Sequence, residues 1–455
     1  MKDLLTDVAR RAIRYQENLD TRSVGPSKDA VAALSGLGGE LPDEPTDPKE
    51  IVRLLDELGS PATVATTGGC YFGFVIGGTL PAALASHWLA GAWDECAGGY
   101  RTSPVTAALE EICLGWLLDV LRLPEGTGGG FVTGATMANF TALSAARHAL
   151  LERQGWDVEA RGLFGAPPVK VVVGDEVHAS MLKALALVGF GRERLHRVPV
   201  DVAGRMRADQ LPELDDKTLI CIQAGNVNTG AFDPAPDICA AARETKAWVH
   251  VDGAFGLWAR ATPARAHLAA GYEGADSWAV DAHKWLNVPY DSGLVFCRQP
   301  EHMEAAMSVS AAYLMASENR EPSHYTPEMS SRTRAAEIWA ALRSLGRTGL
   351  ADMFERSCQQ AARFAEGLEA AGSHVLNDVQ LNQVLVSFGD ADTTRRVIAA
   401  VQEDGTCWCG GTVWQGHTAM RISVSSWATT EDDVERCLAA ILQVAKEQQQ
   451  RSCGS

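Results

Sequence analysis

The sequence predicts an α/β protein with a mostly parallel central sheet covered by helices and a smaller α/β domain near the C-terminus. Between about residues 61 and 300, short runs of β-branched and apolar residues alternate with helical patterns. Most of these runs contain few polar residues, as expected of strands buried on both faces of a parallel sheet. From about residue 301, long helical patterns come before two further strands and a closing helix.

The elements follow in chain order. The first twenty residues have an amphipathic helical pattern with charges throughout, unlike the apolar core of a signal peptide. A connector rich in proline, glycine and acidic residues spans residues 37–50, so we expect residues 1–60 to form an N-terminal helical segment. The large domain is expected at residues 61–300, with strands at 169–174, 218–225, 247–253, 276–282 and 293–297.

Residues 301–455 form the predicted small domain. Its first helix is expected at RTRAAEIWAALRSLG, and its strands are expected near QVLVSFG and MRISVSS. The closing helix begins with a Thr-x-x-Asp capping pattern in TEDDVERCLAAILQVAKEQQQ.

Charge and cysteine usage exclude several classes of protein. A net charge of −17 with scattered basic residues argues against a nucleic-acid partner and favours a small-molecule ligand. The eleven cysteines are dispersed and form no CxxC pair, so we expect reduced thiols and a cytoplasmic location. No apolar run is long enough to span a bilayer, so we expect no membrane contact.

Small residues at Gly134, Ala135 and Thr136 lead into a long helical pattern. A helix N-terminus offers free N–H groups and a positive dipole end, and Thr136 adds a hydroxyl, so this turn is a candidate phosphate cradle. An ordinary capped helix is the alternative, because neither GxGxxG nor a P-loop is present.

Asp252 and Lys284 follow two successive predicted strands. Open α/β sheets bind ligands at such strand ends, and a carboxylate among apolar residues needs a positive partner, for which a cofactor ring nitrogen would suffice. A lysine beside tryptophan, leucine and proline loses solvation, which frees its lone pair for attack on a carbonyl. A turn aspartate, a surface lysine and a loop histidine at His283 are the alternatives.

Three other positions could carry chemistry. His178 follows a strand, where an imidazole can lie flat against a ring, and Arg421 could grip a carboxylate from a small-domain strand. A buried structural histidine and a surface ion pair are the alternatives. The stretch CWCGGTVWQGH (407–417) suggests metal binding, but two cysteines one residue apart distort a tetrahedral site, so we expect no metal there.

The order of these signals resembles that of the fold-type I pyridoxal 5′-phosphate enzymes. The specific resemblance is to the amino-acid decarboxylase group that includes glutamate, aromatic amino-acid and diaminobutyrate decarboxylases. It is carried mainly by HVDGAFG and VDAHKWLNVPYDSG, and supported by YFGFVIGGTLPAALASHWL, TGATMANFTALSAAR and GNVNTGAFDP. It covers nearly the whole chain and implies pyridoxal 5′-phosphate as the cofactor.

The resemblance also implies roles at the cofactor ring. Lys284 matches the lysine that forms the internal Schiff base, and Asp252 matches the aspartate that keeps the ring nitrogen protonated. Ala254 would pack beneath the ring and His178 would stack above it. Asn226 falls where the family often has threonine near the ring hydroxyl.

Other implied positions contact the phosphate or the substrate. Ala135, Thr136 and His283 match phosphate-contacting positions. Arg421 matches an arginine associated with the substrate carboxylate. The remaining matches line an apolar side-chain pocket, at Phe74, Val75 and Trp285.

The resemblance also bears on the residue that returns a proton to the substrate. The decarboxylases generally use a tyrosine on a long mobile loop, whereas the matching segment here is shorter and offers Tyr313 and Tyr325. We expect Tyr325 to act, since it lies closer to the following helix, with a structural tyrosine as the alternative. Gly253 and Ala282 also depart from the usual alanine and proline.

The predicted function is decarboxylation of an L-amino acid to an amine and CO2, with an apolar or aromatic side chain favoured. Carbon–carbon lyase or aminotransferase activity on the same scaffold is the alternative, and a non-catalytic protein that senses or stores the cofactor is a third reading. The intact set of Lys284, Asp252 and His178 argues against the third. The resemblance further implies a homodimer with its active site at the subunit interface.

Overall fold

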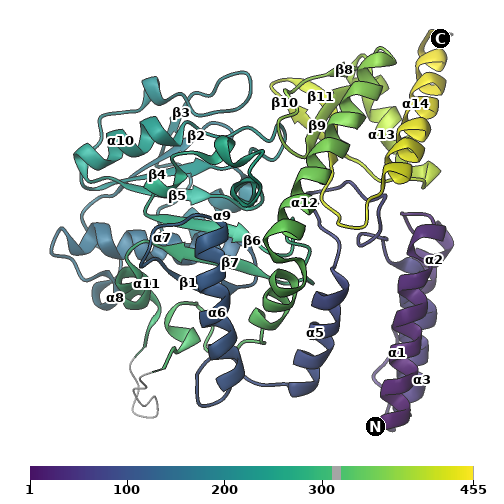
Figure 1. The fold of residues 1–455 in the computed structure, drawn as a ribbon, viewed down its shortest axis with the longest axis horizontal. Coiled ribbons are helices and arrows are strands. Elements are labelled where there is room, and N and C mark those ends of the chain that lie inside the picture. The colour runs from purple at the N-terminus through teal and green to yellow at the C-terminus, as the bar shows by residue number, and fades with distance from the viewer. Residues whose placement is uncertain (310–318, 454–455) are drawn as a thin grey trace. The chain divides into compact units, whose positions relative to one another are not determined.

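The structure, a computed structural model, describes residues 1–309 and 319–453. The chain divides into two compact units (Figure 1). The small unit comprises residues 1–78, 363–376 and 385–455, and the large unit comprises residues 79–362 and 377–384. The division into residues 1–60, 61–300 and 301–455 that the sequence suggests stays a prediction. The two units are defined by spatial contacts, which do not test where separately folding domains begin and end.

A seven-stranded sheet forms the centre of the large unit, with strand order β1-β7-β6-β5-β4-β2-β3. Strands β2 to β6 pair in parallel, whereas β7 runs antiparallel to both β6 and β1. This confirms the predicted α/β class. The strands are β1 (Gly128–Val132), β2 (Lys170–Gly174), β3 (Leu195–Val198), β4 (Thr218–Gln223), β5 (Trp248–Asp252), β6 (Ser277–Asp281) and β7 (Gly293–Cys297).

Strands β1 and β3 were not predicted, for different reasons. Strand β1 has the sequence GGGFV, and glycine has low strand propensity. A Cβ at Gly128 would lie 2.4 Å from Pro300 Cβ, and one at Gly130 would lie 2.5 Å from the backbone oxygen of Tyr325. These glycines therefore permit close packing of later segments. Strand β3, LHRV, lies at the sheet edge with two exposed positions and lacks a continuous apolar run.

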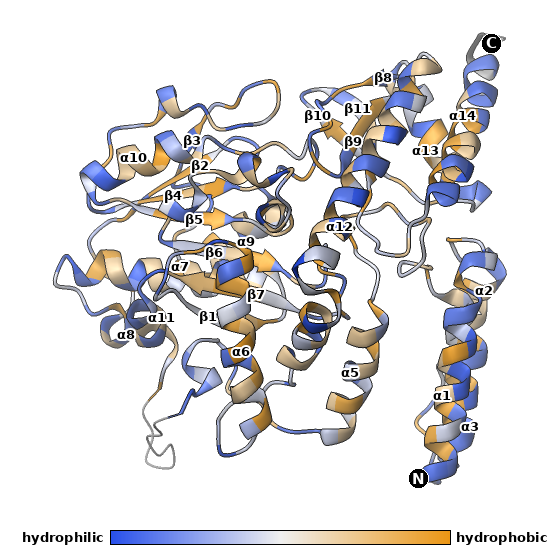
Figure 2. Cartoon of the chain, in the orientation of Figure 1, coloured by the Kyte–Doolittle hydropathy of each residue, from blue (hydrophilic) through white to orange (hydrophobic). Residues whose placement is uncertain are grey.

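Helix α7 packs against β1, β5, β6 and β7 and against the helices α8, α9 and α11. Alanines fill much of its buried face, so the helix can lie close to the strands, which appear hydrophobic in Figure 2. The main helices of the large unit are α5 (Pro81–Trp93), α6 (Pro104–Val120), α7 (Ala135–Glu152), α8 (Val158–Arg161), α9 (Ala179–Leu187), α10 (Ala235–Thr245) and α11 (Pro300–Met307).

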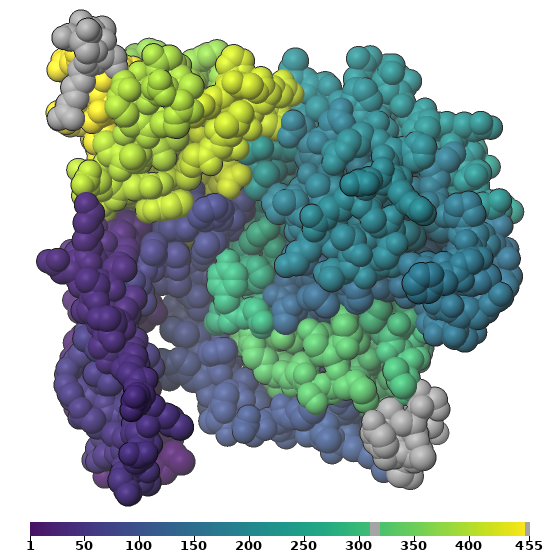
Figure 3. Space-filling model, turned by 180° about the vertical axis from the view of Figure 1, so that it is seen from behind, coloured from purple at the N-terminus to yellow at the C-terminus, as the bar shows by residue number. Residues whose placement is uncertain are grey.

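Helix α12 (Ala335–Ala370) begins at the fourth residue of the predicted RTRAAEIWAALRSLG helix and is broken at Gly346, whose φ is 62°. Its residues from Arg363 onward belong to the small unit. In a space-filling view, the teal and green segments of the large unit form one continuous surface (Figure 3).

The small unit combines N-terminal helices with a C-terminal α/β part. The N-terminal helices are α1 (Lys2–Glu17), α2 (Lys28–Ala33) and α3 (Pro48–Leu54). A four-stranded sheet has the order β10-β11-β9-β8, in which β10–β11 and β8–β9 are antiparallel pairs. Its elements are β8 (His374–Val375), β9 (Gln383–Ser387), β10 (Gly410–Trp414) and β11 (His417–Ser423), with α13 (Ala391–Asp404) and α14 (Glu431–Cys453).

The cap predicted for the closing helix is present. The backbone N–H of Asp433 donates to Thr430 Oγ1 at 3.1 Å, and the Thr430 N–H donates back to Asp433 Oδ2 at 3.0 Å. This reciprocal pair satisfies donors that would otherwise lack intrahelical partners. Among the helices of the described residues, none combines the length and the apolar character needed to cross a bilayer.

Candidate active site

Lys284 follows β6 and pairs with a buried carboxylate at the end of that strand. Its Nζ lies 3.1 Å from Asp281 Oδ2, and the two side chains are 19% and 3% exposed. Strand β6 lies beside β5, so Lys284 and Asp252 follow neighbouring parallel strands at the same edge of the sheet. The surface-lysine alternative is therefore wrong, because this amine is held inside the large unit.

Asp281 joins the lysine segment to the first residue of α7. Its Oδ1 accepts a hydrogen bond from the Ala135 N–H at 2.5 Å, and its backbone oxygen accepts from Trp258 Nε1 at 3.0 Å. Sequence reasoning missed this residue. The available signal was an acidic residue at a strand end, three positions before the lysine.

His283 is neutral, with its proton on Nε2. Its Nδ1 accepts a hydrogen bond from the Ser292 N–H at 3.0 Å, which leaves Nε2 as the protonated nitrogen of the neutral ring. Burial lowers the pKa of His283, although Asp281, 3.5 Å from Nε2, opposes this shift. The ring stacks on Tyr290 with centroids 4.2 Å apart. His283 therefore presents an N–H donor near the start of α7.

Gly134 makes room for that imidazole. A Cβ at this position would lie 2.9 Å from His283 Cε1 and 3.3 Å from Asp281 Oδ1. The N–H of Ala135 is already bonded to Asp281, and the first intrahelical bond runs from the Ala138 N–H to Gly134 O. The N–H groups of Thr136 and Met137 precede that bond and, together with the Thr136 hydroxyl, supply the donors of the predicted phosphate cradle.

Asp252 is buried at the end of β5 and receives two hydrogen bonds. Asn139 Nδ2 donates to its Oδ2 at 3.3 Å, and the Ala254 N–H donates to its Oδ1 at 3.2 Å. Both donors are neutral, so Asp252 can still attract a positively charged partner. Ala254 is itself half-buried, two residues after the end of β5.

A buried chain of polar groups supports Asn139. Its Oδ1 accepts from His250 Nε2 at 2.9 Å, and His250 Nδ1 lies 2.9 Å from Ser277 Oγ. Burial lowers the pKa of His250 to about 3, so its ring is neutral and its proton sits on Nε2, facing Asn139. Trp248 Nε1 donates to the same serine at 3.0 Å. No local pattern in the sequence indicates this chain of polar contacts.

His178 and Asn226 make local contacts in the large unit. His178 is the N-cap of α9, where its Nδ1 accepts from the Ser180 N–H at 3.2 Å. Asn226 is buried, and its Oδ1 accepts from the backbone N–H groups of Asn228 and Thr229 at 2.9 and 3.3 Å. Its amide nitrogen is the group that remains for contact with a ring hydroxyl.

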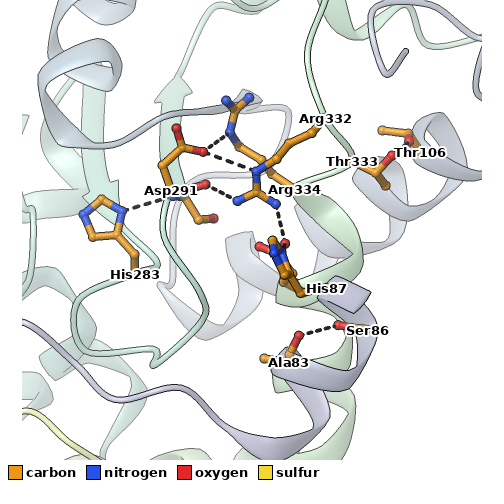
Figure 4. Close-up of polar contacts among 11 residues, drawn as sticks. Ala83, Ser86, His87, Thr106, His283, Asp291, Arg332, Thr333 and Arg334 are labelled. Atoms are coloured by element: carbon orange, nitrogen blue, oxygen red, sulfur yellow. Dashed lines mark hydrogen bonds and ion pairs between the residues drawn. The ribbon is translucent and has the colours of Figure 1, made fainter. Parts of the chain in front are cut away.

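Two arginines hold the segment between Lys284 and Ser292. Asp291 Oδ1 accepts from Arg334 Nε at 3.1 Å and lies 3.4 Å from Arg332 Nε, and the two guanidinium groups converge on it in Figure 4. Burial opposes ionisation of Asp291, but Arg334 and Arg332 together bring its pKa below the ordinary value. Because Asp291 precedes Ser292, the donor to His283, this cluster orients the histidine.

Tyr325 is half-buried and packs under a guanidinium. Its ring centroid lies 4.4 Å from Arg320 Cζ, and Arg320 Nε donates to the buried Glu110 at 2.8 Å. Burial, with a contribution from Glu304, raises the pKa of Tyr325, so the phenol stays protonated at neutral pH. Tyr313, the other candidate acid, lies outside the described residues.

Trp285 is fully buried in the large unit. Its ring lies 4.9 Å from that of Phe354, which also contacts Trp258 at 5.7 Å. This aromatic packing fixes the residue that follows the lysine.

The other predicted substrate residues belong to the small unit. Phe74 and Val75 have φ angles of 54° and 59°, in the left-handed region that β-branched and bulky residues rarely adopt. Phe74 is exposed and lies 5.4 Å from the Trp408 ring, which also stacks on Tyr71 at 5.1 Å. Arg421 is on β11, and burial lowers the pKa of its guanidinium.

Comparison with known proteins places this geometry in a family. Residues 62–389 match the family described as the pyridoxal-dependent decarboxylase conserved domain. An aromatic-L-amino-acid decarboxylase of Bacillus atrophaeus is 25% identical, with 79% of this chain and 74% of that protein covered. Tyrosine decarboxylase 1 of Narcissus pseudonarcissus is 27% identical, with 87% and 83% covered.

Solved structures agree in fold. The structure of Oryza sativa TDC with PLP and tryptamine aligns with a TM-score of 0.91 at 21% identity, covering 98% of this chain and 97% of that one. The structure of mouse CSAD aligns with a TM-score of 0.90 at 20% identity, covering 98% of each chain. This confirms the expected fold-type I architecture.

The residues of the large unit fit pyridoxal phosphate. They include a lysine paired with Asp281 near the start of α7, a strand-end carboxylate whose two donors are neutral, and the helix N-terminus that follows Gly134, where a Cβ would meet the His283 ring. The family match spans well over half of the chain. The protein thus belongs to the pyridoxal-dependent decarboxylase family, as a pyridoxal 5′-phosphate-dependent carboxy-lyase acting on an L-amino acid.

Proposed function

We propose that this protein decarboxylates an aromatic L-amino acid to the matching amine and CO2. The observation that carries the proposal is the placement of Lys284 and Asp252 after neighbouring parallel strands, each held by its own polar contacts. The names of the relatives favour an aromatic substrate, since they include aromatic-L-amino-acid, tyrosine and tryptophan decarboxylases.

When bound, pyridoxal phosphate supplies a covalent link to the substrate amine and a ring that accepts the electrons left behind by CO2. Asp252 holds a proton at the ring nitrogen, which strengthens this electron acceptance. Asn139 and the Ala254 N–H keep its two oxygens in place, since each oxygen receives one hydrogen bond.

Lys284 would hold the cofactor through its side-chain amine. Asp281 pairs with Lys284 before the cofactor binds, so the charged amine is stabilised inside the protein. Thr136, His283 and the turn at Ala135 would hold the phosphate, with the neutral His283 able to donate from Nε2. By the same resemblance, His178 and Ala254 would hold the ring, and Asn226 would contact its hydroxyl.

The substrate residues are assigned by resemblance. Arg421 binds the α-carboxylate and stays charged despite its lowered pKa, because a guanidinium deprotonates only at very high pH. The same resemblance assigns side-chain recognition to Phe74 and Val75 of the small unit and to Trp285 of the large unit, whose apolar surfaces suit an aromatic ring better than a carboxylate.

Tyr325 is the proposed acid that returns a proton to the α-carbon. Its raised pKa keeps the phenol protonated at neutral pH, and Arg320 limits the motion of its ring. We further propose a cytoplasmic homodimer, with the active site at the interface between subunits, on the basis of the resemblance alone.

The test is direct. The cofactor-loaded protein is incubated separately with each L-amino acid, CO2 release is followed, and the organic product is identified by mass. One equivalent of amine per CO2, for an aromatic substrate and at the highest kcat/KM, is the expected result. A keto acid or an aldehyde without CO2 would instead indicate aminotransferase or carbon–carbon lyase activity.

Lys284→Ala is the matched negative variant, and Lys183→Ala is its control, since Lys183 is an exposed lysine on α9 of the same unit. Lys284→Ala should lose both turnover and the absorbance of lysine-bound cofactor, whereas Lys183→Ala should keep both. Retention of that absorbance in Lys284→Ala would remove Lys284 from its role.

A further inference from the structure

A cluster of metal-ligating side chains lies on the large unit, formed by His148 and Glu152 of α7 and His302 of α11. One ligand atom from each of the three residues lies within 4.8 Å of the others. Because His148 and Glu152 are four residues apart on one helix, they share a face, and the packing of α11 on α7 brings the third ligand to them.

Two of the three distances between ligand atoms suit a small ion after a slight contraction, and the third, between the two histidine nitrogens, is within 4.8 Å. His148 Nε2 lies 3.6 Å from Glu152 Oε2, and His302 Nδ1 lies 3.7 Å from the same oxygen. A tetrahedral zinc ion, with bonds of about 2.0–2.1 Å, places its ligand atoms about 3.4 Å apart. Rotation of the Glu152 side chain, which is 60% exposed, can supply the few tenths of an ångström required.

The first histidine is already oriented by a second carboxylate. His148 Nδ1 lies 2.7 Å from Glu159 Oε2 on α8. A carboxylate accepts the proton of that nitrogen, so the lone pair of the neutral ring resides on Nε2, the atom facing Glu152. Carboxylate–histidine–metal arrangements of this kind are a recurrent feature of zinc sites. This contact is independent of the three-ligand cluster.

The second histidine is also fixed. The His302 ring packs against the buried Trp248 with centroids 5.9 Å apart and lies 5.6 Å from the His148 ring. The two histidines are only 15% and 14% exposed, whereas Glu152 opens toward solvent. The nitrogens are thus held before binding, and an ion has a path of entry beside the carboxylate.

Arginines nearby do not occupy the ligand atoms. Arg153 Nη1 donates to the backbone oxygen of Lys246 at 2.8 Å, and Arg147 Nη2 lies 3.6 Å from the other oxygen of Glu159. Arg147 therefore neutralises part of the charge on Glu159 and leaves the two histidines and Glu152 available.

We propose that His148, Glu152 and His302 bind one divalent transition-metal ion of the zinc class, with Glu159 as the residue that orients His148. Two imidazoles and a carboxylate suit zinc and its neighbours, whereas magnesium and calcium require oxygen ligands. The ion would join the last turn of α7 to α11. Since the first turn of α7 forms the phosphate cradle, the site would stabilise the helix that carries it.

The test measures zinc binding by the cofactor-loaded protein. Equilibrium dialysis against zinc chloride, followed by elemental analysis, should show that His302→Gln and His148→Gln each bind one zinc equivalent fewer than the wild type. His196→Gln, which replaces an exposed histidine on β3 of the same unit, is the control and should match the wild type. Other zinc-binding groups, such as buried thiols, affect all of these proteins equally and cancel in the comparison.

Two more variants sharpen the result. Glu159→Gln keeps every ligand and should weaken zinc binding roughly 10- to 100-fold. Glu152→Gln is the variant least able to disturb folding, because its side chain is the most exposed, and it should lose the same zinc equivalent. Zinc should raise the melting temperature of the wild type but not that of His302→Gln, and excess magnesium should not compete.

Equal zinc stoichiometry and equal affinity in the wild type, His302→Gln and Glu152→Gln would overturn the proposal. If circular dichroism shows that His302→Gln is unfolded, the zinc stoichiometry of Glu152→Gln alone decides the proposal, since this variant removes the exposed ligand of the same ion.

Discussion

Asn139 Nδ2 lies 3.3 Å from Asp252 Oδ2, so the carboxylate proposed to face the cofactor ring is held by a residue of the same helix that starts at the phosphate cradle. Behind Asn139, His250 and Ser277 continue the contact into the core. The position of Asp252 therefore depends on how α7 packs on β5.

Replacing Asn139 with leucine should lower kcat/KM by roughly tenfold or more, because Asp252 loses a donor and His250 keeps a buried N–H without a partner. The absorbance of lysine-bound cofactor should persist, since Lys284 is untouched. Ser144→Ala is the matched control, as Ser144 is a buried polar residue on the same helix that bonds only to Phe140 O in its turn. An unchanged kcat/KM in Asn139→Leu would show that the hydrogen bond from Asn139 to Asp252 does not affect the reaction.

His250 should make stability fall with acidity. Its folded pKa of about 3 is below its ordinary value of 6.5, so below pH 6.5 the unfolded chain takes up a proton that the folded protein does not. Stability from this group is full above pH 6.5 and falls by about 1.4 kcal/mol per pH unit as pH drops toward 3, or about 2 kcal/mol between pH 7 and pH 5. His250→Gln, which does not titrate, should lack this slope in urea unfolding.

The control for that experiment is His196→Gln, which removes an exposed histidine and should keep the pH dependence of the wild type. Parallel slopes for the wild type and His250→Gln would show that His250 is not buried as a neutral ring.

Gly134→Ala should weaken cofactor binding. The new methyl group would lie 2.9 Å from His283 Cε1, forcing the imidazole away from the cradle, and overpacking of this kind costs about 1–3 kcal/mol. Titration with pyridoxal phosphate, followed by absorbance, measures the effect. Gly115→Ala on α6 is the control, because a Cβ there meets no atom within 4 Å. Equal cofactor affinity in both variants would contradict the close approach of Gly134 and His283.

Tyr325→Phe should still release CO2 while forming less amine, since the proposed proton donor is removed and the ring packing under Arg320 is kept. An abortive or oxidative product should take the place of the amine in the mass spectrum. Tyr15→Phe, in the small unit, removes an exposed hydroxyl that contacts Thr63 and should leave the product ratio unchanged. A normal amine yield in Tyr325→Phe would exclude Tyr325 as the proton donor and leave Tyr313 as the candidate.

Much of the central sheet could be predicted because its strands are nearly uniform in polarity. Every residue of β4, β5 and β6 is buried. Strands that are covered on both faces need apolar residues at successive positions, and such runs are visible in the sequence. Strand β1 was not predicted because its three glycines have low strand propensity. Glycine is required there because later segments, such as those at Pro300 and Tyr325, pack closely against the strand. Strand β3 escaped because an edge strand need not be apolar.

The residues of the site also fall into two groups, those that a local sequence pattern indicates and those that it does not. Lys284 and Asp252 could be chosen from the sequence because each follows an apolar strand, and successive parallel strands end at one edge of a sheet. Asn139 could not, since its partner Asp252 lies more than one hundred positions away. Asp281 left one local signal, its place three positions before Lys284, but its contact with Ala135 is equally distant in the chain. Local patterns contain no information on such pairings.

By itself, the sequence determined the α/β class and placed Asp252 and Lys284 at the ends of predicted strands, because buried strands leave a local pattern of polarity; the roles proposed for these two residues rest on the resemblance to the family. Only the tertiary structure decided which groups meet those residues: Asp281 at Lys284, Asn139 and His250 behind Asp252, and His302 beside His148. The physical reason is that helix packing and strand register, which are set by contacts distant in the chain, fix which side chains face one another.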